Sequence, residues 1–196
     1  MANITASLVN ELRKRTGVGM MDCKKALVEC DGDMDKAIDY LREKGQKLAA
    51  KRADRDASEG AVLAAVNQDK TFAAVIMMNC ETDFVAKNDG FVDFAKTVLN
   101  AAIAAKAKDL QAVMSLTIDG VSVETMIIEQ VAKIGEKITL SHYLPIEAPA
   151  AYAYVHPGNR MASVVGLSKT GYDEEGKEMA MQVIAGRPVA LNKATV

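Results

Sequence analysis

The sequence predicts an α+β protein in which a helical N-terminal part precedes two units built from an antiparallel hairpin and a helix. Two observations support this prediction. Apolar residues recur at helical spacing up to about residue 45, and from residue 60 onward they alternate with polar residues, as in half-buried strands. The order hairpin then helix occurs twice, at 60–105 and at 151–185. This recurrence indicates two similar subdomains.

Three short amphipathic periods make up the N-terminal part. The first spans residues 4–16, the second 20–30 and the third 34–44, with glycine-containing breaks between them. Asp33 is expected to cap the third helix, and Gly45 is expected to end it. Such a short stretch with two breaks predicts a compact three-helix module.

Changes in composition predict the domain boundaries. The three-helix module is expected at 1–50, and the charged residues at 51–59 are interpreted as a solvated linker. A first α+β subdomain is expected at 60–148 and a partial second one at 149–196. Because residues 46–58 show no apolar stripe that could dock the module, we expect the module to be separable from the remainder.

The two subdomains contain strand pairs bounded by polar turns and helices bounded by capping residues. In chain order, the expected elements are a hairpin at 62–78, a helix at 91–102, a short helix at 109–116, a helix at 122–134 ended by Gly135, a strand at 138–144, a hairpin at 152–167 and a helix at 173–185.

Composition disfavours several classes of protein. The chain has 24 Lys+Arg against 26 Asp+Glu, so it lacks the excess of positive charge that binding to nucleic-acid phosphates favours. Its three cysteines form no CxxC pair and no Cys/His cluster, as expected for reduced thiols in a cytosolic protein. The first residues show no apolar core of the signal-peptide kind, and the apolar run from Phe72 to Met78 is far shorter than the ~18 residues of a membrane span. We therefore expect a cytoplasmic protein that binds no metal, no nucleic acid directly and no membrane.

Residues typical of catalytic sites are scarce. There are two histidines, His142 and His156, and none of the common nucleophile, zinc-protease or phosphate-loop motifs occurs. His142 lies in an alternating pattern and is interpreted as a packed or edge-strand residue, and the acidic residues are scattered over helix surfaces. We therefore expect a protein that is not an enzyme. A small enzyme using Asp83 and a histidine is the third-ranked alternative.

The junction Asn79–Asn88, of sequence NCETDFVAKN, is the most distinctive segment, because it lies between a buried strand and a helix. Thr82 can cap the turn, and Asp83 would lie at the positive end of the following helical segment. Phe84 has two interpretations. It is either an ordinary core residue or an exposed aromatic beside an acid, a geometry suited to wedging a partner apart.

Four segments resemble the family of bacterial translation elongation factor Ts. In chain order they are ITASLVNEL at 4–12, TGVGMMDCKKAL at 16–27, NCETDFVAK at 79–87 and AKIGEK at 132–137. The resemblance covers nearly all of this chain. Family members usually continue past the second subdomain, so the resemblance presents the second subdomain as incomplete and the chain as truncated at its C-terminus.

The resemblance implies a guanine nucleotide exchange factor in translation elongation. Such a protein binds elongation factor Tu·GDP, dislocates Mg²⁺ and promotes GDP release so that GTP can bind. The three-helix module would be ubiquitin-associated-like, and the partner would be bound in its GDP-bound and nucleotide-free states without any cofactor. The segment Thr82, Asp83, Phe84 and Val85 matches the family segment that dislocates Mg²⁺ from the partner.

Family contacts with the partner map onto six further positions: Met20, Met21, Lys24, Ile134, Gly135 and His156. Alternatives remain open for several of them. Both methionines can instead be core residues with Lys24 solvated, and Ile134 and Gly135 can be a buried residue and a helix cap. The second-ranked function is a generic interaction module whose helical domain binds a ubiquitin-like or peptide partner, although that function gives the NCETDFVAK junction no task.

Overall fold

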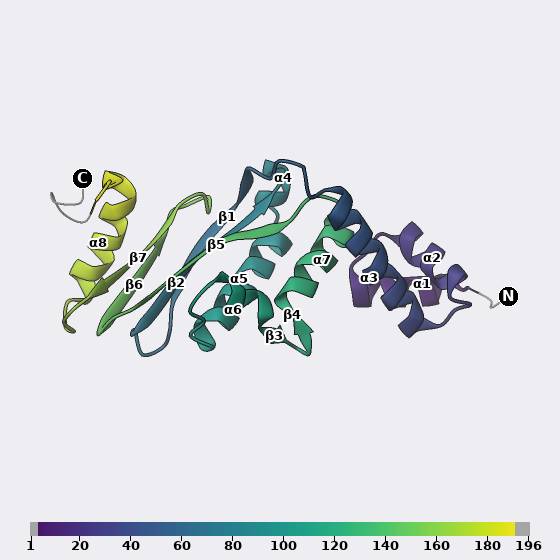
Figure 1. Ribbon diagram of the computed structural model, residues 1–196, viewed down its shortest axis with the longest axis horizontal. Helices are drawn as coiled ribbons and strands as arrows, with labels where there is room; N and C mark the ends of the chain where they lie inside the picture. The colour runs from purple at the N-terminus through teal and green to yellow at the C-terminus, as the bar shows by residue number, and fades with distance from the viewer. Residues whose placement is uncertain (1–3, 191–196) are drawn as a thin grey trace.

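Three helices form one end of an elongated molecule (Figure 1). In the computed structural model, which describes residues 4–190, they are α1 (Ala6–Thr16), α2 (Met20–Glu29) and α3 (Met34–Lys51). Their caps follow the sequence: Asp33 accepts hydrogen bonds at the start of α3, and Gly17, with φ of 69°, ends α1. The helices bury one small cluster made of Val9, Leu12, Val18, Cys23, Ala26, Leu27, Ala37 and Leu41.

Helix α3 does not end at Gly45, so that prediction was wrong. Gly45 is buried inside α3, where this helix packs on α7 (Val123–Ile134). A Cβ atom at Gly45 would lie 3.0 Å from Ala132 Cβ and 3.3 Å from the Ile128 carbonyl oxygen. The glycine therefore allows two helices to approach closely, a tertiary role that spacing along the chain does not distinguish from a helix stop.

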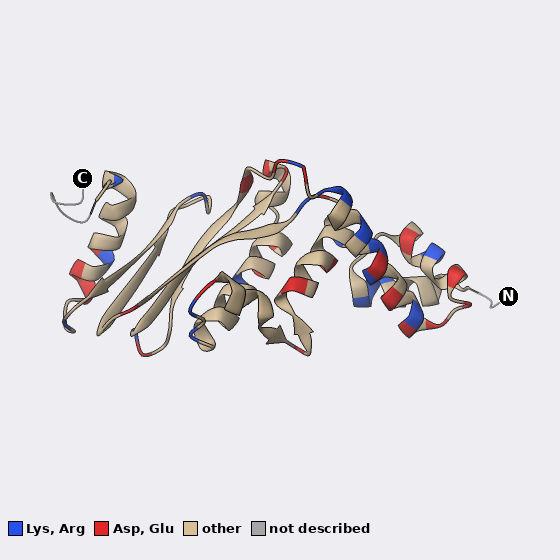
Figure 2. Ribbon diagram, viewed as in Figure 1, with Lys and Arg blue, Asp and Glu red and all other residues tan. Residues whose placement is uncertain are grey.

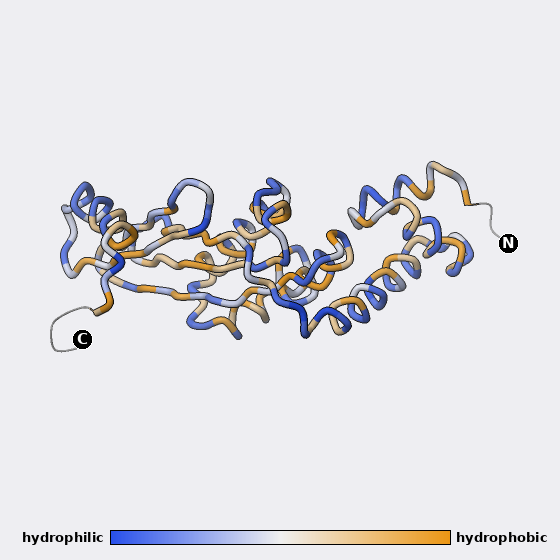
Figure 3. Tube along the Cα trace, turned by 90° about the horizontal axis from the view of Figure 1, so that it is seen from above, coloured by the Kyte–Doolittle hydropathy of each residue, from blue (hydrophilic) through white to orange (hydrophobic). Residues whose placement is uncertain are grey.

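The last turns of α3 also contact the larger core. Leu48 and Ala49 are partly buried against it. The sequence-based expectation that the region after residue 45 offers no apolar contact to the remainder is therefore wrong. A strongly hydrophilic stretch follows only after α3 and leads into the first strand (Figure 3).

A three-stranded antiparallel sheet forms the centre of the molecule (Figure 1). Its strands are β1 (Glu59–Val66), β2 (Phe72–Cys80) and β5 (Thr139–Glu147), in the order β1-β2-β5. The hairpin β1-β2 pairs from Glu59 with Cys80 to Val66 with Ala73, and the pairing of β2 with β5 shifts at Met77/Met78. The predicted hairpin and the predicted strand are both confirmed.

Helices cover one face of this sheet. The segments between β2 and β5 are α4 (Asp83–Ala86), α5 (Asp89–Ala104), α6 (Leu110–Ser115), β3 (Thr117–Ile118), β4 (Val121–Ser122) and α7. Helix α5 has the most buried residues of these helices and shares one core with β1, β2 and α7. The sequence-based helices at 91–102, 109–116 and 122–134 are confirmed, with Asn88, Asp109 and Ser122 as side-chain caps.

A second hairpin and the last helix form the other end of the molecule (Figure 1). Strands β6 (Ala150–Val155) and β7 (Ala162–Leu167) make a separate two-stranded sheet, and α8 (Asp173–Gly186) packs on it. The β6–β7 turn returns to the central sheet, because Val62 N donates a hydrogen bond of 2.7 Å to the Asn159 carbonyl. The predicted elements are confirmed, so the fold is α+β, while the grouping into two similar subdomains stays a prediction.

Candidate functional site

The junction after β2 presents an exposed aromatic side chain on a short helix. Thr82 caps α4, and its side chain accepts a hydrogen bond of 3.4 Å from Val85 N. The Lys87 ammonium bonds Asp83 at 2.6 Å and holds the pKa of that carboxyl below its usual value. Phe84 is 84% exposed, so its interpretation as a core residue is excluded.

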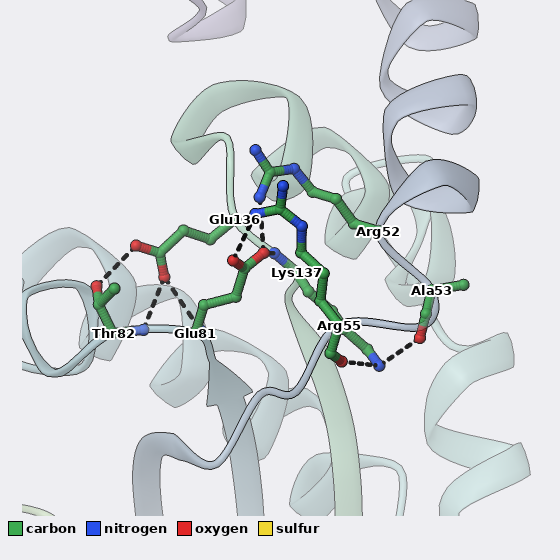
Figure 4. Close-up of polar contacts among 7 residues, drawn as sticks. All are labelled: Arg52, Ala53, Arg55, Glu81, Thr82, Glu136 and Lys137. Atoms are coloured by element: carbon green, nitrogen blue, oxygen red, sulfur yellow. Dashed lines mark hydrogen bonds and ion pairs between the residues drawn. The ribbon is translucent and has the colours of Figure 1, made fainter.

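Two carboxylates link the junction to the loop that follows α7 (Figure 4). Glu136, after α7, accepts hydrogen bonds from Glu81 N and Thr82 N at 3.0 Å each and from Thr82 Oγ1 at 2.7 Å. Glu81 in turn accepts from Lys137 N at 2.6 Å. The backbone of each segment is therefore bound by a carboxylate of the other.

Two arginines from the segment that follows α3 complete this cluster. Glu81 accepts from Arg52 at 2.7 Å and from Arg55 at 2.9 Å, and the side chains of Glu81 and Arg52 are only 16% and 19% exposed. The Lys137 N–H and the two guanidinium groups together lower the pKa of Glu81 to about 2. The carboxylate is therefore ionised at neutral pH and tied to three donors. Charged residues are dense at this point and on the three-helix module, whereas the strands carry few (Figure 2).

A surface pocket brings Phe84 together with residues that are distant in sequence. Its lining contains Phe84 and Val85 from the junction, Ile134 from the end of α7, and Gly17 from the end of α1. Ile134 is half-buried against the core, and Gly135 ends α7 with φ of 83°. A packed isoleucine and a cap glycine therefore describe these two residues in this fold, and Ile134 also borders the junction.

The α2 residues implied by the resemblance lie on the surface. Met20 is 49% and Met21 is 76% exposed, and Lys24 is exposed as well. The alternative that both methionines belong to the core is therefore wrong. Two exposed methionines on one short helix are flexible, polarizable contact groups of the kind found on protein-binding surfaces.

His156 lies apart from Phe84, at the end of the second hairpin. Its ring nitrogen Nδ1 is 3.1 Å from the Tyr154 hydroxyl, and its backbone N–H donates to the Met161 carbonyl. The histidine is exposed and lines a different pocket, together with Tyr154 and Met161. It is thus available for contact but is not part of the junction.

The described residues offer little support for catalysis. Between residues 4 and 190, no hydrogen bond joins Asp83 to a histidine; Asp83 bonds Lys87, and His142 Nδ1 lies 2.8 Å from Ser141 Oγ. The same part of the chain contains no cluster of three potential metal ligands. Nor does any helix described here have the length and hydrophobicity needed to cross a bilayer. Burial raises the pKa of the Cys80 thiol to about 11, which makes it a poor nucleophile.

The fold and the junction together define an α+β protein whose distinctive surface feature is an exposed aromatic ring beside a hydrogen-bonded backbone. The family model "Elongation factor TS" matches residues 81–196, and the model "Elongation factor Ts, mitochondrial, N-terminal" matches residues 1–49. The chain belongs to the elongation factor Ts family. This membership implies a non-catalytic role as a nucleotide exchange factor for elongation factor Tu in translation.

Curated relatives match the whole chain. The elongation factor Ts of Christiangramia forsetii is 52% identical over 198 residues, which cover 100% of this chain and 72% of the relative. The corresponding protein of Amoebophilus asiaticus is 48% identical, with 97% of this chain and 70% of the relative covered. That of Flavobacterium psychrophilum is 45% identical, covering 100% and 72%.

Sequence reasoning missed the residues that hold the junction. Glu81 and Glu136 lie inside the segments that resemble the family, but their partners are not local: 55 residues separate Glu136 from Glu81 N. Arg52 lies in the segment interpreted as a solvated linker, yet its side chain is largely buried against Glu81. A segment of alternating charges does not show which of its side chains pairs with a buried group. No local signal could therefore have identified Arg52, Glu81 and Glu136 as the residues that hold the junction.

Proposed function

We propose that this chain binds elongation factor Tu·GDP, dislocates Mg²⁺ from it and so promotes GDP release, which allows GTP to bind. The observation that carries the proposal is the 84% exposure of Phe84 on a junction whose backbone N–H groups at Glu81 and Thr82 donate to the Glu136 carboxylate. A large apolar ring that is mostly exposed to solvent does not contribute to the core of this fold, and it is free to insert between side chains of a binding partner.

Thr82, Asp83, Phe84 and Val85 would act together on the partner's metal site. Mg²⁺ requires nearly ideal octahedral geometry at short distances, so small displacements of its oxygen ligands weaken its binding sharply. Inserting the Phe84 ring between partner side chains would produce such a displacement without any contact with the nucleotide. Asp83, at the first turn of α4, would hold the inserted segment by hydrogen bonding.

Further contacts would supply affinity. We expect Met20, Met21 and Lys24 to face the partner from α2, Ile134 and Gly135 to border the inserted segment, and His156 to contact it from the second hairpin. The factor would bind both the GDP-bound and the nucleotide-free partner, with no direct contact with nucleic acid, and would act in the cytoplasm. Exchange follows from linkage: a factor that prefers the nucleotide-free partner must weaken GDP binding by the same factor.

The test compares GDP dissociation from elongation factor Tu in the presence of the parent chain and its variants. Phe84→Ala should slow the factor-dependent release at least about tenfold, which corresponds to about 1.4 kcal/mol. Its free energy of unfolding should change by less than about 0.5 kcal/mol, because the ring is exposed. Asp83→Asn should fold normally and give a smaller defect. Tyr172→Ala, which removes an aromatic ring that is 47% exposed at the far end of the molecule, is the matched control.

The metal dependence separates Mg²⁺ dislocation from general binding energy. Both junction variants should show their largest defect with Mg²⁺ present, since excess EDTA removes the ion that the segment displaces. Equal fractional defects in Mg²⁺ and in EDTA would count against dislocation. If the parent chain does not accelerate GDP release at all, the proposed function is wrong.

A further inference from the structure

Helix α4 keeps Phe84 in place although it is only four residues long. A single helical turn is not stable in water by itself, because nucleation fixes several residues for one hydrogen bond. Of the residues of α4, only Ala86 is buried, and Phe84 contributes almost no core contact. The conformation of this turn must therefore depend on groups outside it.

The Glu136 carboxylate supplies those contacts. Its Oε2 accepts hydrogen bonds from the backbone N–H groups of Glu81 and Thr82, and its Oε1 accepts one from Thr82 Oγ1. The same Thr82 hydroxyl oxygen accepts the capping bond from Val85 N. One carboxylate thus fixes two peptide groups before α4 and orients the hydroxyl that caps it (Figure 4). Hydrogen bonds to an ionised carboxylate are roughly twice as strong as neutral ones.

The position of Glu136 is itself fixed. It follows the cap Gly135, and the next residue, Lys137, donates its backbone N–H to Glu81 at 2.6 Å. The Lys137 ammonium also donates to the carbonyls of Ala53 and Arg55, at 2.6 and 2.8 Å, which ties this loop to the end of α3. The carboxylate of Glu136 is therefore presented from a loop held at several points.

We infer that Glu136 is a positioning residue that locks the Thr82–Val85 turn so that Phe84 meets the partner in one orientation. The consequence for exchange rests on the function proposed above, whereas the consequence for the mobility of Phe84 does not. Binding through an ordered side chain costs less conformational entropy than binding through a mobile one. Glu136 would therefore favour insertion of Phe84 although Glu136 itself does not contact the partner.

The mobility of the turn can be measured without any partner. The chain has no tryptophan, so Phe84→Trp introduces a single reporter for time-resolved fluorescence anisotropy. Adding Glu136→Ala should at least double the amplitude of the fast local motion, and Glu136→Gln, which keeps one acceptor oxygen, should give a smaller increase. Glu124→Ala removes an exposed carboxylate from the first turn of α7, away from the junction, and should leave the amplitude unchanged. An unchanged amplitude with Glu136→Ala would overturn the inference, and urea unfolding of each variant confirms that the fold persists.

A double-mutant cycle tests the effect on exchange. At saturating factor, Glu136→Ala should slow GDP release about tenfold in the parent chain but less than about twofold in the Phe84→Ala background. Glu136→Gln should retain more activity than Glu136→Ala. Equal fold-losses in both backgrounds would show that Glu136 does not act through Phe84 and would overturn the inference. If the parent chain releases no GDP, the proposed function fails, and the anisotropy result still decides whether Glu136 orders the turn.

Discussion

Glu81→Gln tests how strongly the buried charge cluster stabilises the fold. The substitution keeps the size of the side chain but replaces an ionised acceptor of three hydrogen bonds by an amide facing Arg52, Arg55 and Lys137 N. A native pKa of about 2 against an ordinary 4.5 corresponds to at most about 3 kcal/mol. Because the Arg55 side chain is 55% exposed, solvent screens part of this interaction. We expect a loss of about 2 kcal/mol at pH 7.

The stabilisation that Glu81 provides should decrease as the pH falls. The folded-state pKa of Glu81 lies below the unfolded value, so its contribution is complete above about pH 5 and is lost as the pH falls towards 2. About three-fifths of it should be gone at pH 3.

Urea unfolding of the parent and of Glu81→Gln at pH 7, 5, 4 and 3 measures the difference directly. Glu129→Gln is the matched control, because Glu129 also accepts from an arginine, Arg42, but is 37% exposed and, among residues 4–190, accepts from no backbone N–H. The control should cost less than about 1 kcal/mol. A difference below about 0.5 kcal/mol for Glu81→Gln at pH 7, or one that is unchanged at pH 3, would refute this reasoning.

Two further predictions concern backbone packing and domain independence. Gly60→Ala should lower the free energy of unfolding by more than about 2 kcal/mol, because a Cβ atom there would lie 2.2 Å from the Met78 carbonyl oxygen. At Gly120 the added Cβ would meet nothing within 4 Å, so Gly120→Ala should lower it by only about 1 kcal/mol, for its positive φ alone. Thermal unfolding measures both losses, and equal losses would contradict the steric argument. A fragment of residues 58–196 should still unfold cooperatively but at a lower temperature than the full chain, because removing α3 exposes the face of α7 that packs on Gly45. Loss of the cooperative transition in calorimetry would show that the module and the remainder are one unit.

Local signals account for the part of the fold that the sequence predicted. Asp33, Thr82 and Ser122 cap helices through their own side chains, so a polar residue before an apolar period was sufficient to locate these starts. The β1-β2 hairpin was located by its alternating apolar residues, although the buried residues of β1 are only Ala61 and Leu63 and β2 is buried on both faces. Gly45 marks the limit of this approach, since its neighbours Ile128 and Ala132 lie on a helix more than 80 residues away.

The candidate site was predictable in position but not in geometry. The spacing of polar and apolar residues did not decide whether Phe84 is buried, because α4 is a single turn and too short to show a periodic face. The same holds for Met20 and Met21, which lie on a ten-residue helix whose buried face is completed by Cys23 and other residues. Exposure is a property of what packs against a residue, and for these short helices that information is not local.

Three segments that resemble the elongation factor Ts family meet at one surface, although they are far apart in the sequence. The pocket at Phe84 is lined by Gly17 from 16–27, by Phe84 and Val85 from 79–87, and by Ile134 from 132–137. Packing of the central core does not explain why these residues lie together at the surface. Each has a different structural role: Gly17 ends a helix, Ile134 is half-buried, and the Phe84 ring is exposed. They converge beside a backbone that the Glu136 carboxylate holds. An exposed apolar group, a recess next to it and support from several elements are the features of a contact surface.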